Sequence, residues 1–354
     1  MSSSLVSEKK LSFIDKFLTI WIFIAMGIGI SLSIWFPGFV VWIRSSDFEG
    51  TNVPIAIGLI FMMVPPLAKV NFARIPKAFG RIDLILYSLF LNWVIGPLLM
   101  FGLAFLFFPE NPEYRVGLIL IGIARCIAMV LVWNDLADGD REVAAGLVAL
   151  NSIFQLLFYG VIAYFFVSVL PGTFGFTNSS IHISYWDIVY SVLIYLGIPF
   201  LLGLGIRNAS LRLKGEEWTT QKLLPSISPI TLIFLLLTIV FIFSLKGESL
   251  INIPWDVLQI SAPLLVYFLL MFFLSFALGL LIKADYPRNV AVSFTAAGNN
   301  FELAIAVAIG TFGIASGQAF VGIVGPLVEI PVLVLLVEIA KIFREKFYVK
   351  GKTA

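Results

Sequence analysis

Residues 121–135 read IGIARCIAMVLVWND and place an arginine beside the only cysteine of the chain, in a run otherwise apolar enough to cross a membrane. A charge at the centre of a bilayer is costly, and estimates for one arginine run from about 2.5 to more than 10 kcal/mol. Such a residue is tolerated where it faces the protein interior or a water-filled path. The stretch therefore predicts a functional site within a membrane-spanning segment.

A second apolar stretch, SFTAAGNNFELAIAVAI at 293–309, also carries polar side chains at membrane depth, namely Asn299, Asn300 and Glu302. In many transporters the substrate site lies near the middle of the membrane and is formed by interrupted helices. Two interrupted segments with polar groups therefore indicate a transporter.

The composition indicates an all-α integral membrane protein. Only 12% of the residues are charged, against about 25% in a soluble domain, and the apolar runs have the length of helices rather than of barrel strands. One cysteine excludes an internal disulfide and a cysteine-rich metal cage. No P-loop, Ser/His/Asp set or HExxH motif occurs. We therefore expect no enzymatic activity, no cofactor and no nucleic-acid partner; protein partners are not indicated.

The hydropathy pattern predicts ten transmembrane helices within a single membrane domain that covers residues 1–354. The connections are short and often marked by proline or glycine, so no soluble domain interrupts the chain. The expected helices cover 17–36, 53–70, 84–108, 116–134, 143–169, 188–206, 226–245, 258–282, 289–312 and 318–340.

The lysines and arginines of the loops predict the orientation. One side collects Lys9, Lys10, Lys16, Lys69, Arg74, Lys77, Arg81, Arg141, Arg207, Arg212, Lys214, Lys222, Lys283, Arg288, Lys341, Arg344, Lys346, Lys350 and Lys352, while the other has Arg44, Arg115 and Lys246. Cytoplasmic loops carry the excess of basic residues. Both termini are therefore predicted to be cytoplasmic, with the protein in the cell (plasma) membrane.

The two halves of the chain correspond when the first is shifted by about 175 residues, so that repeat one covers about 12–170 and repeat two about 186–342. Because each repeat has an odd number of helices, the second must enter the membrane inverted, as in many secondary transporters. The shift pairs helix 116–134 with helix 289–312, the fourth with the ninth. We expect both of these helices to be broken and to form the site.

Glu302 is the most informative acid; it lies well inside an expected span, three residues after Asn299, so that both can share one helix face. Burial disfavours the charged form of a carboxylate, so this acid can exchange protons or bind substrate. The alternative is a permanent ion pair with Arg125. Arg125 in turn either takes part in the site or has a structural role, bonding carbonyls freed at a helix break or pairing with Glu302 or Glu329.

Cys126 alone is weak evidence for a functional site, because a lone buried cysteine usually acts as a small, unreactive apolar side chain. A neighbouring cation favours thiolate, and soft sulfur selects thiophilic partners. Asn92, Asn151 and Gln155 can bind substrate, although side chains of these types more often join neighbouring helices. Glu329 either lines a cavity or serves as a counter-ion for the arginine.

Six motifs carry a resemblance over nearly the whole chain. They are ARCIAMVLVWNDLADGD at 124–140, ALNSIFQ at 149–155, AAGNNFELAIAVAIGTFGIASGQAF at 296–320, MVPPLAKV at 63–70, NWVIGPLLM at 92–100 and GPLVEIPVLV at 325–334. Together they resemble the Acr3 family of arsenite efflux permeases.

The resemblance implies the fold of the bile acid/arsenite/riboflavin transporter superfamily. In that fold a core domain of helices 3–5 and 8–10 packs beside a panel domain of helices 1–2 and 6–7, and the broken fourth and ninth helices cross. The implied activity is export of trivalent arsenic, in some members also antimonite, commonly driven by inward proton movement. The family's functional cysteine falls on Cys126 and its functional glutamate on Glu302, with Asn299 and Asn300 in the adjoining motif.

We therefore predict an arsenite/proton antiporter, whose partners are the metalloid, protons and membrane lipid. The expected substrate-binding residues are Cys126, as the thiol contact of the metalloid, Glu302, Asn299, Asn300 and Arg125. Glu302 is also expected to carry the coupling proton, and Asn92, Asn151 and Glu329 to support the site. The alternatives are a sodium-coupled transporter of organic, bile-acid-like anions on the same fold and, less favoured, a channel.

Overall fold

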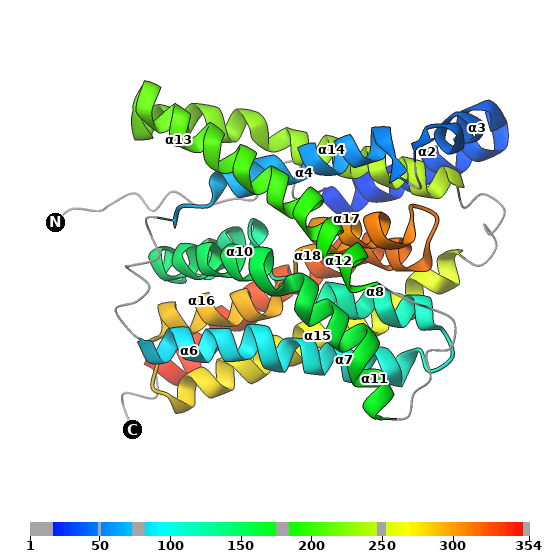
Figure 1. The fold of residues 1–354 in the computed structure, drawn as a ribbon. Coiled ribbons are helices and arrows are strands. Elements are labelled where there is room, and N and C mark those ends of the chain that lie inside the picture. Colours follow the sequence, from blue (N-terminus) through cyan, green and yellow to red (C-terminus); the bar gives the residue numbers. More distant parts are fainter. Residues whose placement is uncertain (1–16, 49–50, 73–81, 175–183, 246–252, 350–354) are drawn as a thin grey trace.

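The computed structural model describes residues 17–48, 51–72, 82–174, 184–245 and 253–349. Within these ranges the chain is helical apart from its connections and the two-residue strands β1 (Asp47–Phe48) and β2 (Thr51–Asn52), which pair antiparallel (Figure 1). Part of the orientation prediction lies outside the described residues. It concerns Lys9, Lys10, Lys16, Arg74, Lys77, Arg81, Lys246, Lys350 and Lys352.

The helices of the first half follow the expected ranges except for α3, which forms where a connection between helices 17–36 and 53–70 was expected; π-helical turns (η) lie inside longer helices. They are α2 (Leu18–Trp35), α3 (Pro37–Ser45), α4 (Val53–Lys69), α6 (Ile82–Phe90), η2 (Leu91–Ile95), α7 (Gly96–Phe107), α8 (Pro112–Ile123), α9 (Met129–Leu136), α10 (Arg141–Tyr164), η3 (Phe165–Val169) and α11 (Leu170–Thr173).

The second half has the same kind of elements. They are α12 (Tyr185–Val192), η4 (Leu193–Gly197), α13 (Ile198–Trp218), η5 (Thr219–Leu223), α14 (Leu224–Leu245), α15 (Ile253–Leu281), α16 (Tyr286–Ala297), α17 (Phe301–Phe312), α18 (Gly317–Phe343) and η7 (Arg344–Val349). Two helices extend well beyond their expected ends. The last continues past residue 340 through α18 and η7 to Val349. α13 continues past residue 206 and reverses at Gly215, whose φ of 81° suits glycine.

Five helical stretches of the described chain are long and apolar enough to cross a membrane. They are Ile82–Phe107, Arg141–Thr173, Tyr185–Leu245, Pro254–Leu281 and Gly317–Val349. A sixth candidate is the pair Ile20–Trp35 and Pro37–Ser45, which bends by 100° where a proline follows the first helix. Large apolar side chains, among them Leu106, Leu201 and Leu281, are more than two-thirds exposed, as on a lipid-facing surface. The prediction of an all-α integral membrane protein is confirmed.

The helices form two layers (Figure 1). In one layer α14 packs against α2 and α4, and α13 packs against α4. In the other, α15 packs against α16 and α18, α7 against α8, and α17 against α18. Contacts of α17 with α4 and of α12 with both α10 and α17 join the layers.

Two of the expected helices are interrupted deep in the molecule. The fourth consists of α8 and α9, separated by residues 124–128, and the ninth of α16 and α17, separated by residues 298–300. Each of the four pieces has only 8 or 12 residues, too short to span a bilayer alone. Most residues of α8 and α16 are buried, the polar Asn289, Ser293 and Thr295 of α16 among them.

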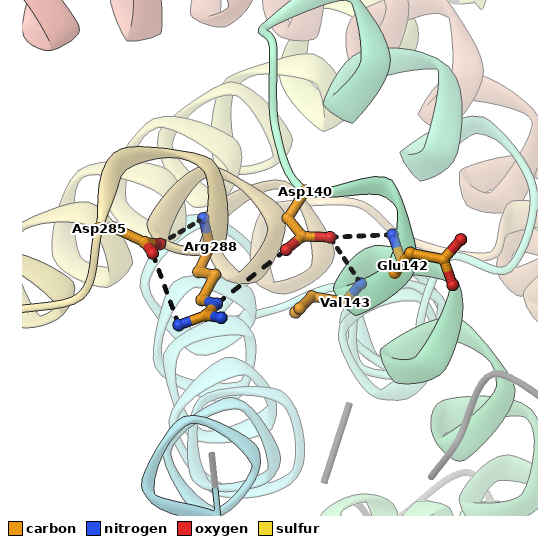
Figure 2. A network of polar contacts seen from close by, with 5 residues as sticks. All are labelled: Asp140, Glu142, Val143, Asp285 and Arg288. Carbon is orange, nitrogen blue, oxygen red and sulfur yellow. Dashed lines mark hydrogen bonds and ion pairs between the residues drawn. The ribbon is translucent and has the colours of Figure 1, made fainter. Parts of the chain in front are cut away.

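The turn before α10 is tied to the turn before α16 (Figure 2). The Asp140 carboxylate accepts hydrogen bonds from the N–H groups of Glu142 (3.0 Å) and Val143 (3.1 Å), and so caps α10. The other oxygen of Asp140 lies 4.0 Å from Nε of Arg288. Nη1 of the same arginine lies 3.5 Å from the carboxylate of Asp285. These contacts hold the start of α10, the helix after the first interrupted one, against the start of α16.

Replacement of Asp140 with alanine is expected to lower the thermal stability of the protein. Loss of the cap should remove about 1 kcal/mol, the usual value for an N-cap aspartate. Asp140→Asn keeps the capping oxygen and loses only a long, exposed ion pair, so it should melt close to wild type. The measurement is thermal unfolding in detergent, and equal melting of the alanine and asparagine variants would contradict the assigned cap.

Candidate functional site

The two breaks lie side by side and form one short antiparallel bridge between Arg125 and Asn299. The N–H of Cys126 donates to the carbonyl of Gly298 (3.3 Å), and the N–H of Asn300 donates to the carbonyl of Ala124 (3.1 Å). A helix that ends inside a membrane leaves backbone groups without partners. Here the two ends satisfy one another, which explains how both helices can be interrupted at this depth.

A constant shift of 174 residues relates the two sides of the crossing (125 to 299). The N–H of Arg125 donates to Oε1 of Gln155 at 2.9 Å, and the N–H of Asn299 donates to Oε1 of Glu329 at 3.3 Å. The same shift relates Gln155 to Glu329. Each break is thus held by a long side chain from the helix that follows it, an amide in one half and a carboxylate in the other.

A small cavity of about 40 Å³ lies against the crossing. Its lining includes Cys126, Asn299, Glu302 and Glu329. The side chains of Cys126 and Glu329 are only 4% and 5% exposed, whereas Glu302 is half-buried. One thiol and two carboxyl groups therefore line one small, partly enclosed space.

A much wider cavity of about 1170 Å³ adjoins the small one. Both cavities are lined by Glu302, and they also share Pro66, Ala128, Met129 and Leu235. The rest of the wide cavity is lined by apolar and uncharged polar residues together with six further charged ones, which are Lys69, Arg141, Glu142, Arg207, Glu216 and Glu217. Glu302 is thus placed where the enclosed space meets the wide one.

Arg125 lies next to Cys126 in sequence but faces another part of the protein. Neighbouring side chains of an extended backbone point to opposite sides, and the bridge makes the backbone extended here. The fully buried guanidinium donates through Nη1 to the carbonyl of Ala296 (3.2 Å), and it lies against the backbone of Gly96. Arg125 lines neither cavity.

The two expected partners of Arg125 are not observed. Among the described residues no ion pair joins it to Glu302 or Glu329, and its Nε and Nη2 atoms have no hydrogen-bond partner there. The contact with Ala296, at the carboxyl end of α16, corresponds to the structural alternative, in which the arginine bonds a carbonyl freed at a helix break.

The two asparagines of the second break mainly stabilise helix ends. Nδ2 of Asn299 donates to the carbonyls of Ile121 (2.6 Å) and Ala124 (3.0 Å), and the residue also lines the small cavity. Oδ1 of Asn300 accepts from the N–H of Leu303 (3.0 Å) and caps α17. Asn300 is outside the lining of both cavities.

The three expected supporting residues, Asn92, Asn151 and Glu329, also differ in whether they bond neighbouring groups or line a cavity. Oδ1 of Asn151 accepts from Nε1 of Trp93 (3.2 Å), which joins α10 to η2, and Nδ2 of Asn92 donates to Ser88 (3.2 Å). Neither asparagine lines a cavity, whereas Glu329 does. The sequence did not indicate the apolar part of the small cavity; it is formed by Pro66, Ile127, Met129, Leu235, Phe301, Pro326 and Ile330, among others.

Comparisons with known proteins show the family of the chain. The sodium bile acid symporter family matches residues 56–253. A protein of Corynebacterium glutamicum named arsenical-resistance protein Acr3 is 50% identical over 93% of this chain and 89% of its own length. A protein of the same name from Alkaliphilus metalliredigens is 30% identical over 96% of this chain and 95% of its own.

An uncharacterized transporter of Synechocystis is 34% identical over 94% of this chain and 89% of its own length. The matches to the two arsenical-resistance proteins extend across both breaks and the helices that hold them. The chain therefore belongs to the sodium bile acid symporter family and to the Acr3 family of arsenical-resistance proteins.

Proposed function

We propose that this protein exports trivalent arsenic, as arsenite and also as antimonite, from the cytoplasm in exchange for protons. The observation that carries the proposal is the small cavity that brings Cys126, Glu302 and Glu329 together. Trivalent arsenic binds soft sulfur, and its hydroxyl groups can donate to carboxylates. The relatives named arsenical-resistance protein Acr3 support the same cargo.

The size and chemistry of the small cavity suit a compact inorganic hydroxide. A volume of about 40 Å³ has room for about three waters, since one water needs about 10–15 Å³ of such space. An arsenic hydroxide has three oxygen atoms. A single thiol cannot form a multi-sulfur cage, so the cargo can leave again.

We infer that the protein has ten transmembrane spans in two inverted repeats, within one membrane domain. The constant shift of 174 residues, which relates both the bridge partners and the side chains that hold the breaks, supports this arrangement. The layer with α2, α4, α13 and α14 corresponds to the expected panel, and the layer with the two breaks corresponds to the core (Figure 1).

The wide cavity would be the inner access path. The basic residues that line it (Lys69, Arg141 and Arg207) belong to the side that the charge bias assigns to the cytoplasm. In this proposal the termini are cytoplasmic, the protein lies in the plasma membrane, and arsenite enters through the wide cavity. Movement of the core against the panel then exposes the small cavity on the outer side.

Coupling requires that arsenite and the proton compete for one site, because a ligand drives a change only through different affinities for the two states. Deprotonated Glu302 accepts hydrogen bonds from the cargo. Protonation of Glu302 from the outer side weakens that binding and releases arsenite. The proton is carried back and leaves on the cytoplasmic side.

The test uses everted membrane vesicles, whose interior corresponds to the outside of the cell. Acidification of the interior should drive uptake of radioactive arsenite, and an ionophore that collapses the proton gradient should stop it. Antimonite should compete with the labelled arsenite. Uptake no greater than in vesicles without the protein would refute the proposed function.

The second candidate is a sodium-coupled transporter of organic anions. It is favoured by the match to the sodium bile acid symporter family and by the volume of the wide cavity, which exceeds what an inorganic hydroxide needs. Thermal unfolding of the purified protein distinguishes the two. Arsenite or antimonite should raise the melting temperature, whereas stabilisation only by bile salts with sodium would favour the second candidate.

A further inference from the structure

Gln155 is buried beside the first break and has no part in the cavities. Its side chain is fully buried on α10 and lines neither the small nor the wide cavity. Oε1 accepts the N–H of Arg125 at 2.9 Å, while Nε2 reaches the carbonyl of Asn151 at 3.4 Å, one turn earlier on the same helix. The amide is thus anchored to its own helix and bound to the broken one.

This hydrogen bond acts directly on the backbone that carries the thiol. The residue after Arg125 is Cys126, whose own N–H is bound to the carbonyl of Gly298. Two successive N–H groups of the unwound segment are therefore fixed, one by Gln155 and one by the other break. With both fixed, the extended backbone directs Cys126 into the small cavity and Arg125 away from it.

We propose that Gln155 is a positioning residue, which holds the first break so that the Cys126 thiol faces the cargo. The inference rests on the proposed function, because it assigns the small cavity to the cargo. Glu329 has the corresponding place in the second half, where its carboxyl oxygen accepts from Asn299. Unlike Glu329, Gln155 has no charge to gain or lose, so its hydrogen bond persists whatever the protonation state of the cavity.

The test relies on Cys126 being the only cysteine of the chain. Membranes are treated with N-ethylmaleimide, and the arsenite concentration that half-protects the thiol from alkylation is measured. Gln155→Met keeps a long side chain and removes the acceptor, so the half-protecting concentration should rise about tenfold, equivalent to about 1.4 kcal/mol of binding. Gln155→Asn, whose shorter amide cannot reach the break, should behave like the methionine variant.

Two further variants separate positioning from loss of packing. Gln155→Glu keeps an oxygen acceptor at the same reach and should return the half-protecting concentration to within about twofold of wild type. Gln318→Met makes the same change at another buried glutamine, at the start of α18 and outside both cavities, and should match wild type. All variants are compared at equal abundance and with equal elution from a sizing column in detergent.

The positioning role would be overturned if Gln155→Met had the half-protecting arsenite concentration of wild type. It would also be overturned if that concentration rose equally in the methionine and glutamate variants. Failure of the proposed function has a different signature, because arsenite would then not protect the wild-type thiol at all. In that case the positioning role is tested by the rate at which N-ethylmaleimide alkylates Cys126 without arsenite. A change of about tenfold in Gln155→Met, reversed in Gln155→Glu, supports positioning, since a misplacement of about 1 Å can alter a rate up to about a hundredfold; an unchanged rate refutes it.

Discussion

Replacement of Cys126 with serine is expected to raise the arsenite concentration for half-maximal export by about tenfold or more, since each tenfold change corresponds to about 1.4 kcal/mol of binding. The thiol lines the small cavity with two carboxyl groups, and it is the only thiol there, beside the thioether of Met129. A hydroxyl of similar size keeps the shape of the site but is a poor ligand for a soft metalloid. Export is measured from an arsenite-sensitive host, with membrane abundance determined in parallel.

The matched control for that change is Ala149→Ser. It introduces a hydroxyl at a fully buried position of α10 that lines neither cavity. Export by the control should equal that of wild type. Wild-type export by Cys126→Ser at normal abundance would return the cysteine to the role of a small buried hydrophobe.

Replacement of Glu302 with glutamine is expected to abolish the dependence of arsenite transport on the proton gradient. Glutamine has nearly the same shape, so the cavity is retained, but it cannot release and bind a proton. Glu302 is placed where the enclosed space adjoins the wide cavity, so it can contact both cargo and solvent. In everted vesicles, accumulation driven by internal acid should fall about tenfold or more, as expected when a group essential to proton transfer is lost.

Glu338→Gln is the control for loss of one negative charge. That carboxylate is 65% exposed and pairs with Lys341 at 3.1 Å, far along α18 from the crossing. Its removal should leave gradient-driven accumulation unchanged. If Glu302→Gln accumulated arsenite as fully as wild type, Glu302 would not carry the coupling proton.

Both breaks were predictable from residue types, because polar and small residues interrupt stretches that are otherwise apolar. Helix 53–70 was expected, and α4 covers Val53–Lys69, because a long apolar run bounded by polar residues determines both ends. The end of α13 was not predictable from hydropathy. Its residues 207–214 (RNASLRLK) are too polar on average to predict a span, yet the alanine, leucines, arginines and lysine among them form helix readily, and the chain reverses only at Gly215.

The sequence placed Cys126, Glu302 and Glu329 in buried positions, and the fold brings all three to one cavity. It also grouped Arg125 with them, and here the structure differs. Adjacent residues of an extended segment point in opposite directions, so the arginine contacts α16 and α7 while the cysteine faces the cavity. The local backbone conformation of the break decides this, and hydropathy does not report it.

The amino-acid sequence by itself determined the class of protein, the location of the helices and the depth of the polar groups. These depend on apolar run length and on the cost of charge in lipid, which are properties of each segment alone. Only the tertiary structure decided which polar groups meet. The pairing of Arg125 with Gln155 and of Asn299 with Glu329 spans 30 residues in each half, and the bridge joins the halves. Such contacts arise because two interrupted helices must satisfy each other's backbone groups, and no single segment contains that information.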